Sequence, residues 1–179
     1  MAESPTSDNP VVYQGVRFDV HAVEYPRRSG GVKRREVVAP PNAVVILPML
    51  DDDTVVLIRN ERFAVGQTLW ELPAGTLEEG ENPALCAARE LVEETGYAAA
   101  QVERMIEFYS TPGFCTERLT AYLARDLTHK GQDLDETERI TTEAAPLNRS
   151  IQMIRDNTIR DAKTIATLLY YQTFLRTGC

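Results

Sequence analysis

The sequence predicts an α/β protein, in which a small antiparallel β subdomain precedes a larger domain of mixed strands and helices. Extended patterns with alternating polar and apolar residues fill most of the chain from 11 to 39. A Pro40-Pro41 pair interrupts them, and strands and helical periodicity follow. We therefore expect a disordered polar tail at 1–10, a β subdomain at 11–40 and a main domain at 41–179.

The β subdomain contains two expected extended segments joined by a basic turn. Residues 11–25 carry β-branched and aromatic side chains between polar ones, and residues 32–39 form the second segment. The turn at 26–31 includes Arg27 and Arg28. Two strands cannot bury a core alone, so we expect this subdomain to lie on the main domain or on a partner chain.

The main domain opens with strands. Residues 43–50 are nearly all apolar, as in a strand covered on both faces. The three aspartates at 51–53 predict a turn and a hairpin with 54–59, and a short strand at 69–72 ends at Pro73.

The clearest helix begins at Asn82-Pro83 and ends at Gly96, because these residues are favoured at the two ends of a helix. After it we expect the following, in order: strands at 101–109 and 118–124, an acidic loop at 132–138, and helices at 147–155 and 161–176.

Composition excludes several classes of function. The chain has 179 residues and a formal net charge of −8, so its surface repels nucleic-acid backbones. No apolar run approaches the roughly 20 residues that a membrane helix requires, and the N-terminus does not resemble a secretory signal. The three cysteines have no metal-ligand spacing, which favours idle thiols and a reducing, cytoplasmic location.

The helix that ends at Gly96 carries a carboxylate face. On a helical wheel Glu90, Glu93 and Glu94 fall opposite the expected apolar stripe of Leu85, Ala88, Leu91, Val92 and Thr95. Arg89 and Glu93 form an i, i+4 pair. Crowded carboxylates suit Mg²⁺ or Mn²⁺, although a solvated acidic face is the alternative.

The segment from Gly75 to Tyr97, GTLEEGENPALCAARELVEETGY, resembles the Nudix box at every defined position. This resemblance implies an α/β/α sandwich around a mixed sheet. It also implies that Glu90 and Glu94 are the principal metal ligands, joined by the carbonyl of Ala74. Arg89 and Glu93 then assist catalysis, and Glu81 supports the loop.

Other segments are similar to the ADP-ribose pyrophosphatase subgroup: the runs 59–66 and 70–75, and Thr111-Pro112-Gly113-Phe114, whose proline follows Gly96 by 16 residues. The resemblance implies Mg²⁺-dependent hydrolysis, with Mn²⁺ able to substitute, of the pyrophosphate of ADP-ribose or a related nucleoside diphosphate sugar. The alternatives are a UDP-glucose or GDP-mannose pyrophosphatase and, from another class, a non-catalytic ligand sensor.

The subgroup further implies a catalytic glutamate on the acidic loop. We assign Glu136 as general base and Glu138 as an extra metal ligand, with a plain solvated loop as the alternative. Relatives form homodimers with exchanged N-terminal strands, and we expect the same here. Candidate substrate contacts are five charged residues and three aromatic ones that could stack on a base: Arg27, Arg28, Arg59, Arg62, Glu117, Tyr13, Phe18 and Tyr25.

Overall fold

The computed structural model describes residues 9–176, so most of the expected tail at 1–10, and Cys179, lie outside the described residues. The chain divides into two compact units. The first comprises residues 1–42 and 108–118, and the second comprises 43–107 and 119–179. The first unit therefore takes in a segment, 108–118, that the sequence alone placed in the main domain.

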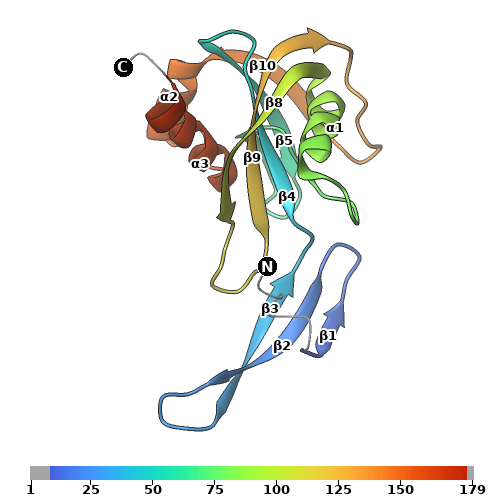
Figure 1. The fold of residues 1–179 in the computed structure, drawn as a ribbon, viewed down its shortest axis with the longest axis vertical. Coiled ribbons are helices and arrows are strands. Elements are labelled where there is room, and N and C mark those ends of the chain that lie inside the picture. The colour runs from blue at the N-terminus through green and yellow to red at the C-terminus, as the bar shows by residue number, and fades with distance from the viewer. Residues whose placement is uncertain (1–8, 177–179) are drawn as a thin grey trace. The chain divides into compact units, whose positions relative to one another are not determined.

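The first unit is built on a three-stranded antiparallel sheet in the order β1-β2-β3 (Figure 1). The strands are β1 (Val11–Gln14), β2 (Asp19–Pro26) and β3 (Val32–Ala39). The single extended stretch expected at 11–25 is thus two strands, separated by a tight turn in which the Gly15 N–H donates to the Phe18 carbonyl (3.1 Å). The predicted basic turn is present between β2 and β3.

This small sheet buries little apolar surface. Ala22 is the one hydrophobic residue of the first unit that is buried among the described residues. Exposed large hydrophobic side chains are instead frequent on its three strands and their turns: Val11, Val12, Tyr13, Val16, Phe18, Tyr25 and Val32. Strands this few and this exposed do not form a core of their own, as predicted from the sequence.

The second unit contains a four-stranded sheet, β7-β4-β9-β8, and a three-stranded sheet, β10-β5-β6. β4 runs parallel to β9 and antiparallel to β7, so the larger sheet is mixed, as expected. The bounds of these strands are β4 (Ala43–Pro48), β5 (Thr54–Arg62), β6 (Gln67–Glu71), β7 (Ala74–Thr76), β8 (Tyr97–Tyr109), β9 (Arg118–His129) and β10 (Ile140–Pro146).

The hairpin expected after the three aspartates is reduced to one bridge, between Met49 and Val55. Beyond that bridge the two strands enter different sheets, because β4 pairs with β9 and β7 whereas β5 pairs with β6 and β10. A hairpin of β4 and β5 alone would leave each strand without a second neighbour. β10, which the sequence analysis did not predict, supplies that neighbour for β5.

Three α-helices cover the strands of the second unit: α1 (Pro83–Thr95), α2 (Leu147–Arg155) and α3 (Ala162–Tyr170), which continues as a π-helical turn over Tyr171–Leu175. Figure 1 shows α1 on one side of the strands and α2 with α3 on the other, which confirms the predicted sandwich. Within residues 9–176, no helix combines the length and apolar character needed to span a membrane.

The hydrophobic core under α1 shows that the predicted stripe on this helix was partly wrong. Cys86, Ala87 and Leu91 pack against Val44 and Ile46 of β4, but Leu85 is 67% exposed. Glu94 is only 3% exposed. The buried face is therefore turned by roughly a quarter of the helix circumference toward the carboxylates.

Candidate active site

The ends of α1 are fixed by the capping residues that the sequence predicted. Asn82 precedes the helix in extended conformation, and its side chain accepts the N–H of Ala84 (2.9 Å). Gly96 adopts a left-handed conformation with φ of 76°, and its N–H donates to the carbonyl of Val92 (2.8 Å). These caps place Glu90, Glu93 and Glu94 in the last two turns of the helix.

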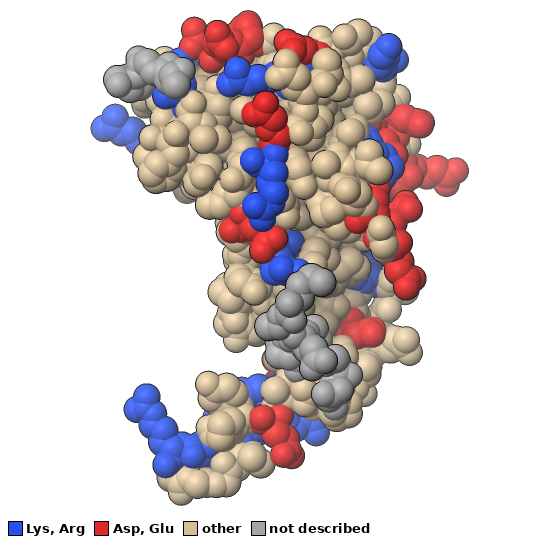
Figure 2. All heavy atoms as spheres, viewed as in Figure 1, with Lys and Arg blue, Asp and Glu red and all other residues tan. Residues whose placement is uncertain are grey.

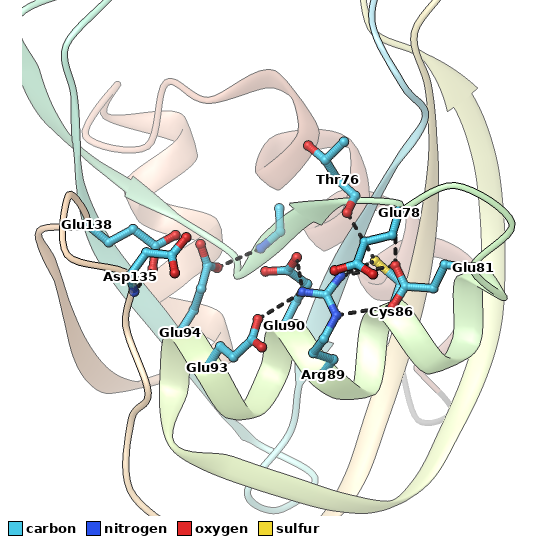
Figure 3. Close-up of polar contacts among 11 residues, drawn as sticks. Thr76, Glu78, Glu81, Cys86, Arg89, Glu90, Glu93, Glu94, Asp135 and Glu138 are labelled. Carbon is cyan, nitrogen blue, oxygen red and sulfur yellow. Dashed lines mark hydrogen bonds and ion pairs between the residues drawn. The ribbon is translucent and has the colours of Figure 1, made fainter. Parts of the chain in front are cut away.

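Arg89 is the centre of an ion-pair network on α1 (Figure 3). Its Nη1 donates to Glu90 Oε1 (2.8 Å) and to Glu93 Oε2 (2.9 Å). Its Nε and Nη2 donate to the two oxygens of Glu81, both at 3.1 Å. Because of the Arg89 hydrogen bonds, the pKa of Glu81 is lowered to about 2. Arg89 therefore orients three carboxylates while using only one oxygen each of Glu90 and Glu93.

Glu94 is held differently, by a backbone amide. Its Oε2 accepts the N–H of Ala74 (2.8 Å). Burial raises the pKa of Glu94 to about 8, and the negative charges of Glu90 and Glu138 act in the same direction. Burial also raises the pKa of Glu90. These two carboxylates are ones that a bound cation would stabilise in their ionised form.

Gly75 allows Glu90 to approach the backbone of β7. A Cβ atom placed on Gly75 would lie 1.8 Å from Cδ of Glu90 and 1.9 Å from its Oε1. No residue with a side chain fits there while Glu90 keeps its position. The glycine that opens the sequence motif therefore forms a cradle for the carboxylate that the resemblance identifies as a metal ligand.

A second buried carboxylate, Glu71 at the end of β6, was missed as a site residue. Arg62 donates to both its oxygens, from Nε at 2.8 Å and from Nη2 at 2.6 Å, and Lys163 Nζ contacts Oε2 at 2.5 Å. Lys163 also pairs with Asp161 (3.0 Å). An acidic residue between Trp70 and Leu72, at the end of a predicted strand, was the signal that could have found it.

The predicted substrate arginines of the second unit have protein partners. Arg62 is engaged by Glu71, and this pairing raises the pKa of Arg62. Arg59 is exposed and lies over the ring of Trp70, its cross-strand neighbour, at 5.3 Å from the ring centroid. Arg27, Arg28 and Glu117 belong to the first unit. A substrate role for all five stays a prediction.

The acidic loop brings Glu138, rather than Glu136, into the electrostatic environment of α1. Glu138 raises the pKa of both Glu90 and Glu94, and Figure 3 shows it beside Glu94. Its Oε2 also accepts the N–H of Asp135 (3.0 Å). The Glu136 side chain is exposed. The backbone carbonyl of Glu136 accepts a hydrogen bond from Nη1 of Arg139 (3.0 Å).

The donor set of this site fits a hard divalent cation. It consists of oxygen ligands only, and acidic side chains gather on the α1 side of the second unit (Figure 2). Over the described residues, no three histidine, cysteine, aspartate or glutamate side chains are already grouped around a common point. Mg²⁺ commonly binds to one or two carboxylates and keeps several waters, so Glu90 and Glu94 with one backbone carbonyl suffice.

Comparison with known proteins identifies the family. The NUDIX domain matches residues 39–168, so the chain belongs to the Nudix family of hydrolases, as predicted from residues 75–97. Nudix hydrolases generally depend on a divalent metal ion. The fold agrees, because a solved structure titled ADP compounds hydrolase superposes with a TM-score of 0.83 at 23% identity, over 95% of this chain and 92% of that one.

Curated relatives are similar over nearly the whole chain. An ADP-ribose pyrophosphatase of Bacillus subtilis is 31% identical, with 95% of this chain and 93% of the relative covered. A methanol dehydrogenase activator of Bacillus methanolicus is 34% identical, with the same coverage of 95% and 93%. A GDP-mannose pyrophosphatase of Salmonella typhimurium is also 34% identical, over 93% of this chain and 91% of the relative.

Proposed function

We propose that this enzyme hydrolyses the pyrophosphate bond of ADP-ribose or a related nucleoside diphosphate sugar, with Mg²⁺ as cofactor. From ADP-ribose the products are AMP and ribose 5-phosphate. The observation that carries the proposal is the way two carboxylates of α1 meet the start of β7: Glu94 accepts the Ala74 N–H (2.8 Å), and Glu90 packs against the bare Cα of Gly75. The similarity to an ADP-ribose pyrophosphatase supports the choice of substrate.

In this proposal Glu90, Glu94 and the carbonyl of Ala74 hold the metal, with Glu138 as an additional ligand. A divalent cation there would neutralise phosphate charge and lower the pKa of a bound water. Arg89 keeps Glu90 and Glu93 in place through the hydrogen bonds described above. Glu136 removes the proton from the attacking water, and phosphorus is attacked directly, so that no covalent intermediate forms.

We also propose substrate contacts for charged and aromatic residues of the first unit. The tip of the β2–β3 hairpin forms an open concavity of about 620 Å³ that is lined by Arg27, Arg28, Lys33 and Arg35, among others. Guanidinium groups there suit a phosphate or a terminal ribose. Tyr13, Phe18 and Tyr25 are exposed, which leaves each of them available to stack on a base.

We further propose a homodimer in which the N-terminal strands are exchanged. The exposed apolar side chains of the first unit, with Ala22 alone buried among its described hydrophobic residues, support a partner that covers them. Analytical ultracentrifugation at micromolar concentration tests this. A particle of 20.1 kDa, the mass of one chain, would contradict it.

A substrate panel tests the proposed activity. The enzyme is assayed with Mg²⁺ on ADP-ribose, UDP-glucose and GDP-mannose, and a phosphatase that acts only on the products releases phosphate for detection. We expect turnover of ADP-ribose with the highest kcat/KM. Preference for GDP-mannose or UDP-glucose would move the enzyme to that class, and binding of all three without turnover would identify a ligand sensor instead.

A further inference from the structure

The backbone that leads from β6 into β7 is anchored at three consecutive residues by three different elements. The Leu72 N–H donates to Oγ1 of Thr164 on α3 (2.8 Å). The Pro73 carbonyl accepts the N–H of Ile46 on β4 (2.8 Å). The Ala74 N–H donates to Oε2 of Glu94 on α1 (2.8 Å). The segment 72–74, which contacts α1, is thus held by α3, by β4 and by α1 itself.

The Thr164 hydroxyl is itself oriented. It donates to Oδ2 of Asp161 (2.6 Å), the residue that caps α3, and the backbone N–H of Thr164 donates to the same oxygen (3.0 Å). Because the hydroxyl proton is used by Asp161, a lone pair of Oγ1 faces the Leu72 amide. Lys163 links Asp161 to Glu71, the residue before Leu72, and so ties the same helix end to β6.

We infer that Thr164, oriented by Asp161, is a positioning residue for the metal site on the opposite helix. The inference rests on the proposed function. Thr164 fixes Leu72, and two residues later Ala74 supplies the amide that holds Glu94 and Gly75 supplies the bare Cα against which Glu90 packs. A shift of this short segment moves the supports of both proposed metal ligands at once. Mutation of side chains that orient metal ligands in this way commonly lowers the affinity for the metal.

Replacing Thr164 with Val tests the inference, because it removes the hydroxyl and keeps the shape. The chain offers a matched control one turn later: Thr167 is also fully buried on α3, but its Oγ1 has no hydrogen-bond partner among the described residues. Mn²⁺ binding to the metal-free full-length protein is measured by electron paramagnetic resonance. We expect Thr164→Val to raise the Mn²⁺ Kd about tenfold, and Thr167→Val and Thr164→Ser to leave it within about twofold.

Kinetics separate positioning from general destabilisation. Thr164→Val should lower kcat about tenfold, leave KM for ADP-ribose nearly unchanged, and regain much of kcat at high Mn²⁺. An unchanged Mn²⁺ Kd in Thr164→Val, or an equal loss in Thr167→Val, would overturn the inference while leaving the proposed function intact. Absence of Mn²⁺ binding by the wild-type protein would overturn both.

A second variant covers the case in which Thr164→Val does not fold. Lys163→Met keeps an unbranched side chain of similar length, one atom shorter, but breaks the link between Asp161 and Glu71. We expect it to raise the Mn²⁺ Kd about threefold and to speed amide exchange at Ala74. A folded Lys163→Met protein with wild-type values for both would contradict the idea that this end of α3 positions the site.

Discussion

Glu71 and Glu94 are both buried glutamates of the second unit, and their charges are balanced in different ways. The Glu71 side chain is 1% exposed, and two cationic side chains contact it. These are Arg62 and Lys163. Glu94 accepts a backbone amide, and its pKa is raised to about 8 by burial. The charge of Glu71 is therefore balanced by ion pairs within the protein. Glu94 has a backbone amide as its hydrogen-bond partner instead, and in our proposal its counter-charge is the bound metal ion.

The surroundings of the two residues strengthen the contrast. Glu90 and Glu138 add negative charge around Glu94, although the more distant Arg62 acts in the opposite direction. Transfer of an ionised carboxylate out of water is costly unless a counter-charge is near. A divalent cation at Glu94 would supply what Arg62 and Lys163 supply at Glu71. We therefore expect that making Glu94 neutral mainly lowers activity, whereas making Glu71 neutral mainly lowers stability.

The largest expected effect is on turnover in Glu94→Gln. The amide keeps the acceptor for the Ala74 N–H but binds Mg²⁺ poorly, so we expect kcat to fall about 10³-fold or more, beyond the tenfold to hundredfold loss typical of residues that only support a ligand. The protein should remain folded. Steady-state kinetics on ADP-ribose, together with circular dichroism, measure both.

Glu71→Gln is the matched counterpart. It leaves Arg62 and Lys163 without their carboxylate, and we expect the free energy of unfolding to drop by about 2–3 kcal/mol, less than for a fully buried pair because Arg62 is partly exposed. Folded Glu71→Gln should keep far more activity than Glu94→Gln. The comparison breaks down if Glu71→Gln loses as much kcat as Glu94→Gln without losing stability.

The acidic loop provides the next test, with an expected effect of about 10²-fold. Glu136→Gln should lower kcat by this amount and leave the Mn²⁺ Kd unchanged, because a general base does not hold the metal. Glu138→Gln should instead weaken Mn²⁺ binding, since Glu138 contributes to the charge around Glu94 and Glu90. The pH–rate profile reports which substitution removes the acidic limb, where the rate rises with pH as the general base loses its proton. The reverse outcome would exchange the two roles.

Local signals in the sequence were sufficient for most of the strands, for the ends of α1 and for the family, but not for β7 or β10. Asn82 and Gly96 cap α1 as predicted because their preferences depend on a few neighbouring residues. The pairing of β5 with β10 was not predictable in this way, since its partner lies some 80 residues further along the chain. The expected hairpin of β4 and β5 is limited to one bridge for the same reason, because β5 pairs with β10 and β6 instead.

The sequence indicated which residues to consider for the site, but not how deeply they are buried or how their charges are balanced. A helical wheel places Glu94 opposite the apolar stripe, yet the segment 72–76 covers that part of α1 and buries it. The supporting residues Glu71 and Thr164 are 93 positions apart, and single-residue preferences do not connect them. Burial and charge balance depend on tertiary packing, so the raised pKa of Glu94 could be derived only from the structure.

The smallest expected effect is a pH dependence of stability without metal. The pKa of Glu94 is about 8 in the folded protein, against an ordinary value of 4.5. The folded state therefore binds more protons between these values, and its stability falls as pH rises from about 4.5 to 8. Glu94→Gln does not titrate. In EDTA we expect the variant and the wild type to have the same free energy of unfolding near pH 4.5. At pH 8 we expect the free energy of unfolding of the variant to be about 1–3 kcal/mol higher than that of the wild type. Urea unfolding at several pH values measures the difference, and a gap that does not change with pH would show that Glu94 is already ionised and balanced like Glu71.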